Sequence, residues 1–361
     1  MLIKHIISAI EEFAPLALQE KWDNTGLQVG DPSAECSGVL LCLDVSESVV
    51  AEAVERGCNL VVSHHPLLFR GLKRITGATP SERCVLAAIK SGVAIYSSHT
   101  ALDSAVGGVS HAIAQSIGAK VERVLHPSEN GPLKLVVYTP RHLAEDVRAA
   151  IADAADEFGG GVPVVAADAV KTESTRTEDA DGVPMLELNH TPYASLSMTI
   201  SSERRREVES VLSGMGDEIT YQFIRLSESD SRTGLGVVAR FDKPIALDAF
   251  MDRVKSACGA DVLRCSELPF PDAEVQRVAV CGGSGGEFIS DAVRAGADAY
   301  ITADVRYHDF AEWGDRILIV DAGHYETESC TKTLFMQLIK EKFANFAVYI
   351  SATEKNPINY L

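Results

Sequence analysis

The stretch GVLLCLDVSESVVAEAVERGCNLVVSHHPLLFRGLKRITGATPSERCVLAAIKSGVAIYSSHT, residues 38–100, alternates short apolar runs with helical segments. The apolar runs are rich in Val, Leu and Ile, and the segments 47–57 and 81–92 between them carry apolar residues at helical spacing. Strands that alternate with helices in this way form βαβ units, in which helices cover parallel strands. The stretch therefore predicts an α/β fold with a mostly parallel sheet and helices on both faces.

The same alternation returns near the C-terminus. From about residue 275 onward the sequence predicts further strands and helices, namely EVQRVAVCGG (274–283), EFISDAVRAGA (287–297), DAYITAD (298–304), RILIVDAGH (316–324), one helix from about Tyr325 to Phe343, and NFAVYISAT (345–353). We expect residues 1–124 and 236–361 to form one α/β body.

Residues 125–235, between these two parts, differ in composition and predict an inserted domain. This segment holds 10 Lys and Arg against 19 Asp and Glu, so it carries −9 of the chain's net charge of −18. Strand-like runs at 133–140, 194–201 and 218–226 alternate with helical patterns at 141–157 and 202–215, which favours a small α+β domain. Residues 171–182 are expected to be a mobile loop rather than a site.

Composition narrows the class of protein. At 361 residues, with 46% hydrophobic and 23% charged residues, the chain should fold into about two domains. Its net charge of −18 argues against general nucleic-acid binding. No apolar run reaches the ~18 residues of a membrane span, and the N-terminus is an amphipathic helix rather than a secretory signal. Eight scattered cysteines without a C-x-x-C pair fit a reducing compartment, so we expect a cytoplasmic protein.

Two adjacent histidines, His64 and His65, end the predicted strand in NLVVSHHPLLF (59–69). Ligands bind at the carboxyl ends of strands in open α/β sheets, and neighbouring residues of a strand point to opposite sides. The two imidazoles could thus serve two metal ions. Taken alone, such a pair is more often a loop cap beside an exposed side chain.

Two other strand ends supply the same kinds of group. VAIYSSHTALD ends in His99 and Asp103, and RILIVDAGHYETE ends in His324 and Glu328. Residues at i and i+4 lie on one face of a helix, so His324 and Glu328 have the spacing of metal ligands, although a surface His–Glu contact would look the same. We predict an open two-metal site with five ligands: His64, His65, Asp103, His324 and Glu328. Nitrogen and oxygen ligands without thiolate suit Zn²⁺, Mn²⁺, Fe²⁺, Ni²⁺ or Co²⁺.

Six motifs resemble those of the dinuclear-metal-centre hexamer family, whose members are commonly labelled homologues of a type 2 GTP cyclohydrolase I. They are KWDNTGLQVG (21–30), SHHPLLF (63–69), SSHTALD (97–103), CGGSGGEFI (281–289), ITADVRYHDF (301–310) and DAGHYETE (321–328). The resemblance implies a toroidal homohexamer with metal pairs facing an internal cavity, the same five ligands, and Glu328 as their bridge. It also implies an inserted domain similar to small trimeric signalling proteins, but EFGGGVPVVAADAV (157–170) replaces the glycine- and histidine-rich segment of many relatives, which puts a ligand-sensing role in doubt.

On this scheme His65 and Asp103 complete the shell of one ion, and His64 and His324 that of the other. Around them, His99, Asp304 and His308 are expected to orient ligands, with an ordinary surface position as the alternative for either histidine. CGGSGGEFI matches no phosphate-binding motif, so we interpret it as a tight turn close to the metals rather than an anion site. The remaining candidates, Trp22, Asp23 and Asn24, are expected at the site entrance or in a subunit contact.

Two functions remain open from the sequence. The first is a metal-dependent hydrolase that acts on a small, nucleotide-like substrate; GTP ring opening is implied by the resemblance alone. The second is a metal-stabilised hexameric scaffold or regulatory binding protein without turnover, which the acidic inserted domain would also suit.

Overall fold

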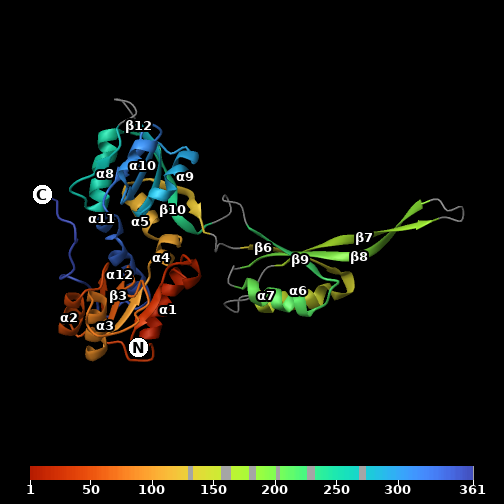
Figure 1. The fold of residues 1–361 in the computed structure, drawn as a ribbon, viewed down its shortest axis with the longest axis horizontal. Coiled ribbons are helices and arrows are strands. Elements are labelled where there is room, and N and C mark those ends of the chain that lie inside the picture. The colour runs from red at the N-terminus through yellow and green to blue at the C-terminus, as the bar shows by residue number, and fades with distance from the viewer. Residues whose placement is uncertain are drawn as a thin grey trace. The chain divides into compact units, whose positions relative to one another are not determined.

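The computed structural model describes residues 1–361 except 129–132, 156–163, 179–183, 201–203, 226–231, 268–273 and 361. The chain divides into two compact units, which we call the body (Met1–Glu129 with Ser231–Leu361) and the insert (Asn130–Asp230). The body is an α/β unit with helices on the faces of its sheets, as the sequence predicts (Figure 1). It contains two separate sheets where the sequence indicated one.

The first sheet has five strands in the order β1-β4-β3-β2-β15, and all neighbours except β1 and β4 are parallel. Helices α2 and α3 follow β2 and β3. Their N-cap residues are Ser46 and Thr79, whose hydroxyls accept from backbone N–H groups. Such caps satisfy donors that a helix start leaves unpaired. The elements of this half are α1 (Ile3–Phe13), β1 (Gly26–Val29), β2 (Val39–Cys42), α2 (Glu47–Glu55), β3 (Leu60–Ser63), α3 (Pro80–Ser91), β4 (Ala94–Ser97) and β15 (Val348–Ile350).

The second sheet has six strands in the order β11-β14-β13-β12-β10-β5. Its central pairs β14–β13 and β13–β12 are parallel, while β11, β10 and β5 pair antiparallel with their neighbours. The strands are β5 (Lys120–Pro127), β10 (Gly234–Ala246), β11 (Arg264–Cys265), β12 (Glu274–Ser284), β13 (Ala299–Ala303) and β14 (Leu318–Asp321). The expected insert boundaries at 125 and 235 therefore fall inside β5 and β10, which pair with each other in the body.

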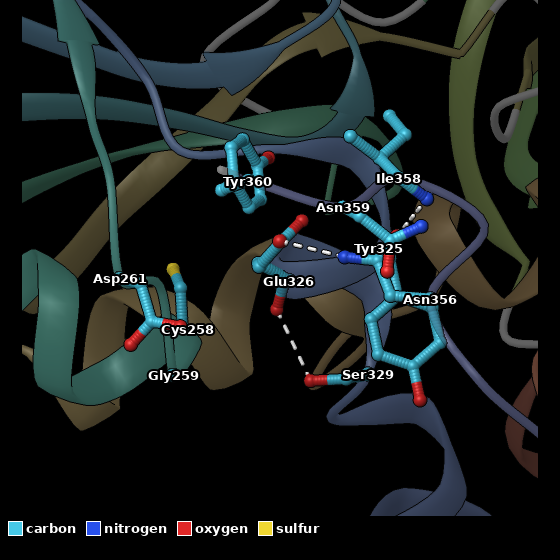
Figure 2. Close-up of a pocket in the computed structure, with 10 residues that line it drawn as sticks. All are labelled: Cys258, Gly259, Asp261, Tyr325, Glu326, Ser329, Asn356, Ile358, Asn359 and Tyr360. Atoms are coloured by element: carbon cyan, nitrogen blue, oxygen red, sulfur yellow. Dashed lines mark hydrogen bonds between the residues drawn. The ribbon is translucent and has the colours of Figure 1, made fainter.

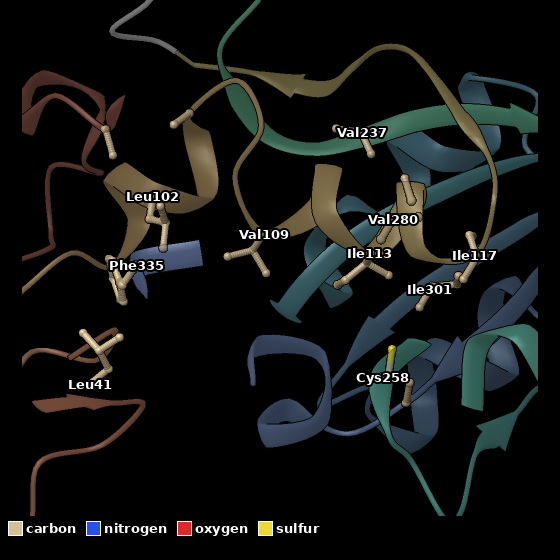
Figure 3. Close-up of a cluster of buried hydrophobic side chains, with 14 of the residues drawn as sticks. Leu41, Leu102, Val109, Ile113, Ile117, Val237, Cys258, Val280, Ile301 and Phe335 are labelled. Carbon is tan, nitrogen blue, oxygen red and sulfur yellow. The ribbon is translucent and has the colours of Figure 1, made fainter. Parts of the chain in front are cut away.

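One apolar core joins the two sheets. Alternate residues of their strands, such as Leu41 in β2 and Val280 and Ile301 in β12 and β13, face this core and are fully buried. The intervening residues bury against α2 and α3 in the first sheet and α9 in the second. Figure 3 shows side chains of the shared core, including Phe335 and Leu102 beside Leu41, and Ile113 near Val280. Each such side chain contributes roughly 1.5–3 kcal/mol on burial, so the core holds the two sheet edges in place.

The other helices of the body are α4 (Thr100–Ser104), α5 (Val109–Ser116), α8 (Leu247–Cys258), α9 (Ile289–Arg294), α10 (Tyr307–Trp313), α11 (His324–Glu328) and α12 (Thr331–Lys342). The prediction of a single helix from Tyr325 to Phe343 is wrong, because the structure has two helices there, α11 and α12, which are separated at residues 329–330. The Thr331 hydroxyl donates to the Glu328 carbonyl and the Ser329 hydroxyl to the Glu326 carbonyl. These side-chain bonds compete with the backbone ladder at the break.

The insert has one antiparallel sheet in the order β7-β8-β6-β9, with α6 and α7 along one face (Figure 1). Its elements are β6 (Leu133–Pro140), α6 (Ala144–Ala155), β7 (Val165–Glu178), β8 (Pro184–Ile200), α7 (Arg205–Gly214) and β9 (Thr220–Arg225). The loop expected at 171–182 is wrong as far as Glu178, since β7 pairs in continuous register with β8. Residues 179–182 lie outside the described residues.

None of the helices in the described part of the chain combines the length and apolar character that a membrane crossing requires.

Candidate metal centre

The carboxyl ends of parallel strands from both sheets meet at one cluster of imidazoles and carboxylates. His64 and His65 follow β3, and His99 follows β4. From the second sheet, α11 begins directly after β14 and carries both His324 and Glu328. Two sheet edges that lie more than 200 residues apart in the chain thus supply one site.

Glu328 lies at the centre of the cluster. Its Oε2 is 2.8 Å from Nε2 of His65 and 3.0 Å from Nε2 of His324, while its Oε1 is 3.6 Å from Nε2 of His64. Only 4% of the side chain is exposed. The two oxygens of one buried carboxylate therefore face imidazoles from both sheets.

Asp103, on α4, faces His64 across a gap of 3.7 Å between Oδ1 and Nε2. Both atoms are buried, and neither has a hydrogen-bond partner among the described residues. Leaving such groups unpaired costs about 1–3 kcal/mol each. The gap is too long for a hydrogen bond, but two atoms that each lie ~2.1 Å from one tetrahedral ion stand ~3.4 Å apart. The residues present therefore fit a divalent metal.

The four imidazoles share one arrangement, in which an acceptor holds Nδ1 from outside and leaves Nε2 turned toward the cluster. These pairs are His65 with Asp44 at 2.8 Å, His324 with Asp304 at 2.7 Å, His99 with Asp23 at 2.8 Å, and His64 with the Ser98 carbonyl at 3.0 Å. Outer partners of this kind fix the ring orientation and tautomer of metal-binding histidines.

Burial and the surrounding charges shift the pKa values in opposite directions. Burial raises the pKa of Asp103 to about 7, helped by the Glu328 charge and opposed by His64. Burial also acts to raise the pKa of Glu328, but the three imidazoles around its carboxylate hold this pKa well below the usual range. Burial lowers the pKa values of His65 and His324, yet hydrogen bonds and charges from Asp44, Asp304 and Glu328 raise them to about 10 and about 9. In the metal-free chain the cluster thus holds protons where cations would bind.

The turn in CGGSGGEFI passes directly against the cluster. Gly283 has a φ of +68°, and a Cβ there would lie 2.0 Å from Oε1 of Glu328. Its N–H donates to Thr327 and its carbonyl accepts from Thr302. Only glycine fits this close approach, which agrees with the interpretation of the motif as a tight turn.

Two sets of donor atoms are close enough to hold an ion: His64, His65 and His99 in one, and His65, His324 and Glu328 in the other. All five ligands predicted from the sequence lie in this region. The sequence-based scheme assigned His65 with Asp103 and His64 with His324; in the structure Nε2 of His65 lies 3.4 Å from Nε2 of His324, and Nε2 of His64 lies 3.7 Å from Oδ1 of Asp103. His99, expected only to orient ligands, offers a donor atom of its own.

The surrounding residues divide into those at the cluster and those outside it. Asp304 orients His324, as expected, and holds a left-handed φ of 55° that Asp tolerates better than most residues. His308 is exposed and contacts the Tyr307 ring, with no described contact to the cluster. Asp23 does not line an entrance: its side chain is fully buried and accepts from His99 and Thr100.

Asp44 was missed by the sequence analysis. It follows β2 as the last residue of GVLLCLD, at the same sheet edge as His64. Because the carboxyl ends of parallel strands meet at one edge of the sheet, the position of Asp44 directly after a strand is a signal that could have located it.

Helix α11 carries a second buried carboxylate, Glu326, which faces a different region. Glu326 is buried on another side of the helix, where Asn356 donates to its Oε1 at 2.8 Å, and it lines a separate hollow of about 430 Å³ with Ser329 and Tyr360 (Figure 2). Glu326 and Glu328 are thus two buried carboxylates of one short helix, of which only Glu328 belongs to the cluster.

The model of the Duf34/NIF3 family (NGG1p interacting factor 3) matches residues 1–357. The chain belongs to this family. A family member from Bacillus subtilis strain 168, named a GTP cyclohydrolase 1 type 2 homolog, is 32% identical over 99% of this chain and 98% of its own length. A Bos taurus relative named NIF3-like protein 1 is 28% identical over 100% and 93%. These names confirm the resemblance seen in the six motifs.

Two solved structures agree with the fold. A Bacillus cereus protein related to NIF3 superposes with a TM-score of 0.70 at 28% identity, covering 100% of this chain and 99% of its own. A Staphylococcus aureus protein superposes with a TM-score of 0.75 at 24% identity and the same coverage, which supports the fold alone.

Proposed function

We propose that this chain holds two divalent metal ions and acts as a metal-dependent hydrolase on a small substrate. The observation that carries the proposal is the pair of buried, unpartnered atoms Nε2 of His64 and Oδ1 of Asp103, which face each other beside Oε1 of Glu328. Unpaired buried donors and acceptors of this kind are stabilised when a cation lies between them.

The contacts support one assignment of ligands. His65 and His324 would hold one ion with Oε2 of Glu328, and His64 and Asp103 the other with Oε1, so that Glu328 bridges both. The donor atom of His99 lies within 4.8 Å of those of His64 and His65, so His99 would be available as a further ligand. The acceptors at Nδ1 keep each imidazole turned inward, and a pair of ions supplies Lewis acidity that polarises a substrate bond.

The donors do not select the metal. Imidazole and carboxylate without thiolate suit Zn²⁺, Mn²⁺, Fe²⁺, Ni²⁺ or Co²⁺. Elemental analysis of purified protein, followed by reloading with each ion, would identify the ion that binds at two per chain.

Turnover is tested with a panel on the metal-loaded chain: formate release from GTP, phosphomonoester and phosphodiester cleavage, and amide hydrolysis. GTP is included because relatives are named GTP cyclohydrolase 1 type 2 homologs. We expect at least one reaction to proceed with the wild type and to be lost in Glu328→Gln. A panel silent with two bound ions would favour the metal-stabilised scaffold instead.

We also propose that the chain forms a homohexamer in the cytoplasm. The assembly rests on the resemblance stated from the motifs, and the compartment on eight cysteines that are all free thiols, six of them buried. Sedimentation velocity at micromolar concentration is expected to give a hexamer; a monomer alone would contradict the assembly.

A further inference from the structure

Two large aromatic side chains are exposed next to the candidate metal centre. Trp22 is 57% exposed and Phe69 is 47% exposed, and their ring centroids lie 5.9 Å apart. Both rings also lie close to the His99 ring, at 6.0 Å and 6.4 Å. Adjacent exposed apolar side chains beside polar residues are typical of a ligand-binding groove or an interaction surface.

His99 connects this aromatic pair to the cluster. Its ring centroid is 5.3 Å from that of His64 and 5.5 Å from that of His65. Trp22 and Phe69 therefore lie one ring away from the predicted ligands. A planar group resting on them would reach the metal centre with its substituents.

The two aromatic residues are held in place by buried or hydrogen-bonded neighbours. Trp22 precedes Asp23, whose buried carboxylate is fixed by His99 and Thr100. Phe69 follows Leu68, whose carbonyl accepts from the Asn24 amide at 2.7 Å. The segments that carry the two rings are thus tied to each other and to the cluster.

The loop that carries Phe69 is basic in a strongly acidic chain. Residues 66–79 contain Arg70, Lys73 and Arg74 and no acidic residue, whereas the whole chain has a net charge of −18. All three cations are exposed, and no ion pair of theirs is found within the described parts of the chain. A local positive field of this kind attracts an anionic ligand.

We propose that Trp22 and Phe69 form a stacking platform for the planar ring of a substrate whose anionic group faces Arg70, Lys73 and Arg74. The substrate class is a phosphorylated heteroaromatic compound, such as a nucleotide. That this ligand is a substrate rests on the proposed hydrolase function, but its binding to the platform does not require turnover. A second copy of the chain is the other possible cover for the exposed rings, and the test separates the two.

The test compares two probes that differ by a ring. Guanosine 5′-monophosphate and ribose 5-phosphate are titrated calorimetrically into the metal-loaded full-length protein. Trp22→Ala and Phe69→Ala should each weaken binding of the nucleotide by roughly 5- to 100-fold, the usual effect of removing a stacking side chain. Binding of ribose 5-phosphate should not change, and Trp22→Phe should retain most of the nucleotide affinity.

Two further variants complete the test, one as a control and one for the anionic part of the proposal. Tyr138→Ala, which removes an exposed aromatic side chain of the insert, should leave both affinities unchanged. Replacing Arg70, Lys73 and Arg74 together with Ser should weaken both probes by the same factor and reduce the salt dependence of binding. Unchanged affinity of this triple variant for both probes would overturn the anionic part of the proposal.

Three results would overturn the platform: no nucleotide binding to the wild type, equal loss of both probes in the aromatic variants, or a smaller assembly in sedimentation of Trp22→Ala. The outcomes also separate this proposal from the hydrolase. Trp22-dependent nucleotide binding with a silent turnover panel would keep the platform and remove the hydrolase. Turnover that is unchanged in Trp22→Ala and Phe69→Ala would keep the hydrolase and remove the platform.

Discussion

The two sheets of the body contribute to the candidate metal centre in different ways. The five-stranded sheet presents His64, His65 and His99 directly after its strand ends, so their positions follow from the sheet edge itself. The six-stranded sheet presents His324 and Glu328 on the short helix α11. A site built at a junction of this kind exists only where both sheets are packed on the same core.

The difference also separates the roles of the side chains. Imidazoles of the first sheet each offer one inward nitrogen, whereas Glu328 offers two oxygens that face different imidazoles. A carboxylate can bind two ions at once, but an Nδ1-anchored imidazole cannot. The second sheet therefore supplies the group on which both halves depend.

The largest effect is expected from Glu328→Gln. The amide keeps the shape of the side chain but removes the charge that faces His64, His65 and His324, so both ions should be lost. Elemental analysis should fall from two metals per chain to nearly zero, with circular dichroism unchanged. Glu326→Gln on the same helix is the matched control and should retain two. Two tightly held ions in folded Glu328→Gln would show that Glu328 does not bridge.

Single-imidazole variants test the pairing inferred from the contacts. His64→Ala should remove the ion shared with Asp103, and His324→Ala the ion shared with His65, each leaving about one metal per chain. The double variant should hold none. His126→Ala, which lies outside the cluster and pairs with Asp291, should keep two. If His64→Ala and His324→Ala together still bound one ion, the original pairing of His64 with His324 would be correct.

Metal affinity is expected to rise with pH. The pKa values of His65 and His324 are raised to about 10 and about 9 in the metal-free chain, and that of Asp103 to about 7. These groups hold protons at neutral pH, and an ion must displace them, so affinity should increase by about tenfold per pH unit for each proton released. Competition titrations with a Zn²⁺ chelator between pH 6 and 8.5 measure the slope. A flat profile would contradict the protonated cluster.

The candidate ligands were easier to predict from the sequence than the elements and residues that hold them in position. Strand ends followed by His or Asp located five candidate ligands, because the direction of parallel strands decides where their ends meet. The division into two sheets, by contrast, depends on which strands pair across long stretches of sequence, such as β2 with β15 in one sheet and β5 with β10 in the other, and these pairings carry no local signal. At the break between α11 and α12, the hydroxyls of Ser329 and Thr331 donate to backbone carbonyls. The sequence does not specify the side-chain rotamers that make these hydrogen bonds.

Asp44 shows the same limit at a single residue. A carboxylate after a strand can be solvated, or it can hold an imidazole from the next strand; only the geometry shows that it lies 2.8 Å from Nδ1 of His65. Asp23 was expected at the site entrance or in a subunit contact, but its side chain is fully buried against His99, which follows β4. The sequence pattern located the candidate ligands, and packing decided which acidic side chains lie against them.

Asp44→Ala should have a smaller effect than loss of a ligand. His65 would keep its place on the sheet edge but lose the acceptor that fixes its ring, which typically weakens metal affinity by about 10- to 100-fold. The stoichiometry should remain two at saturating metal, while one of the two dissociation constants increases. Asp242→Ala is a suitable control, since its carboxylate is exposed and pairs only with Lys120 among the described residues. An unchanged affinity would mean that packing alone orients His65.

The smallest effect is expected from removing the insert, because every residue of the cluster belongs to the body. Strands β5 and β10 are antiparallel neighbours, with Pro127 opposite Gly234, and the Ser128 N–H donates to the Thr233 carbonyl. Replacing residues 129–232 with Asn-Gly should therefore close an ordinary two-residue hairpin. The shortened chain should keep two metals and the far-ultraviolet spectrum of an α/β protein. A folded product without metal would show that the insert is needed to build the site.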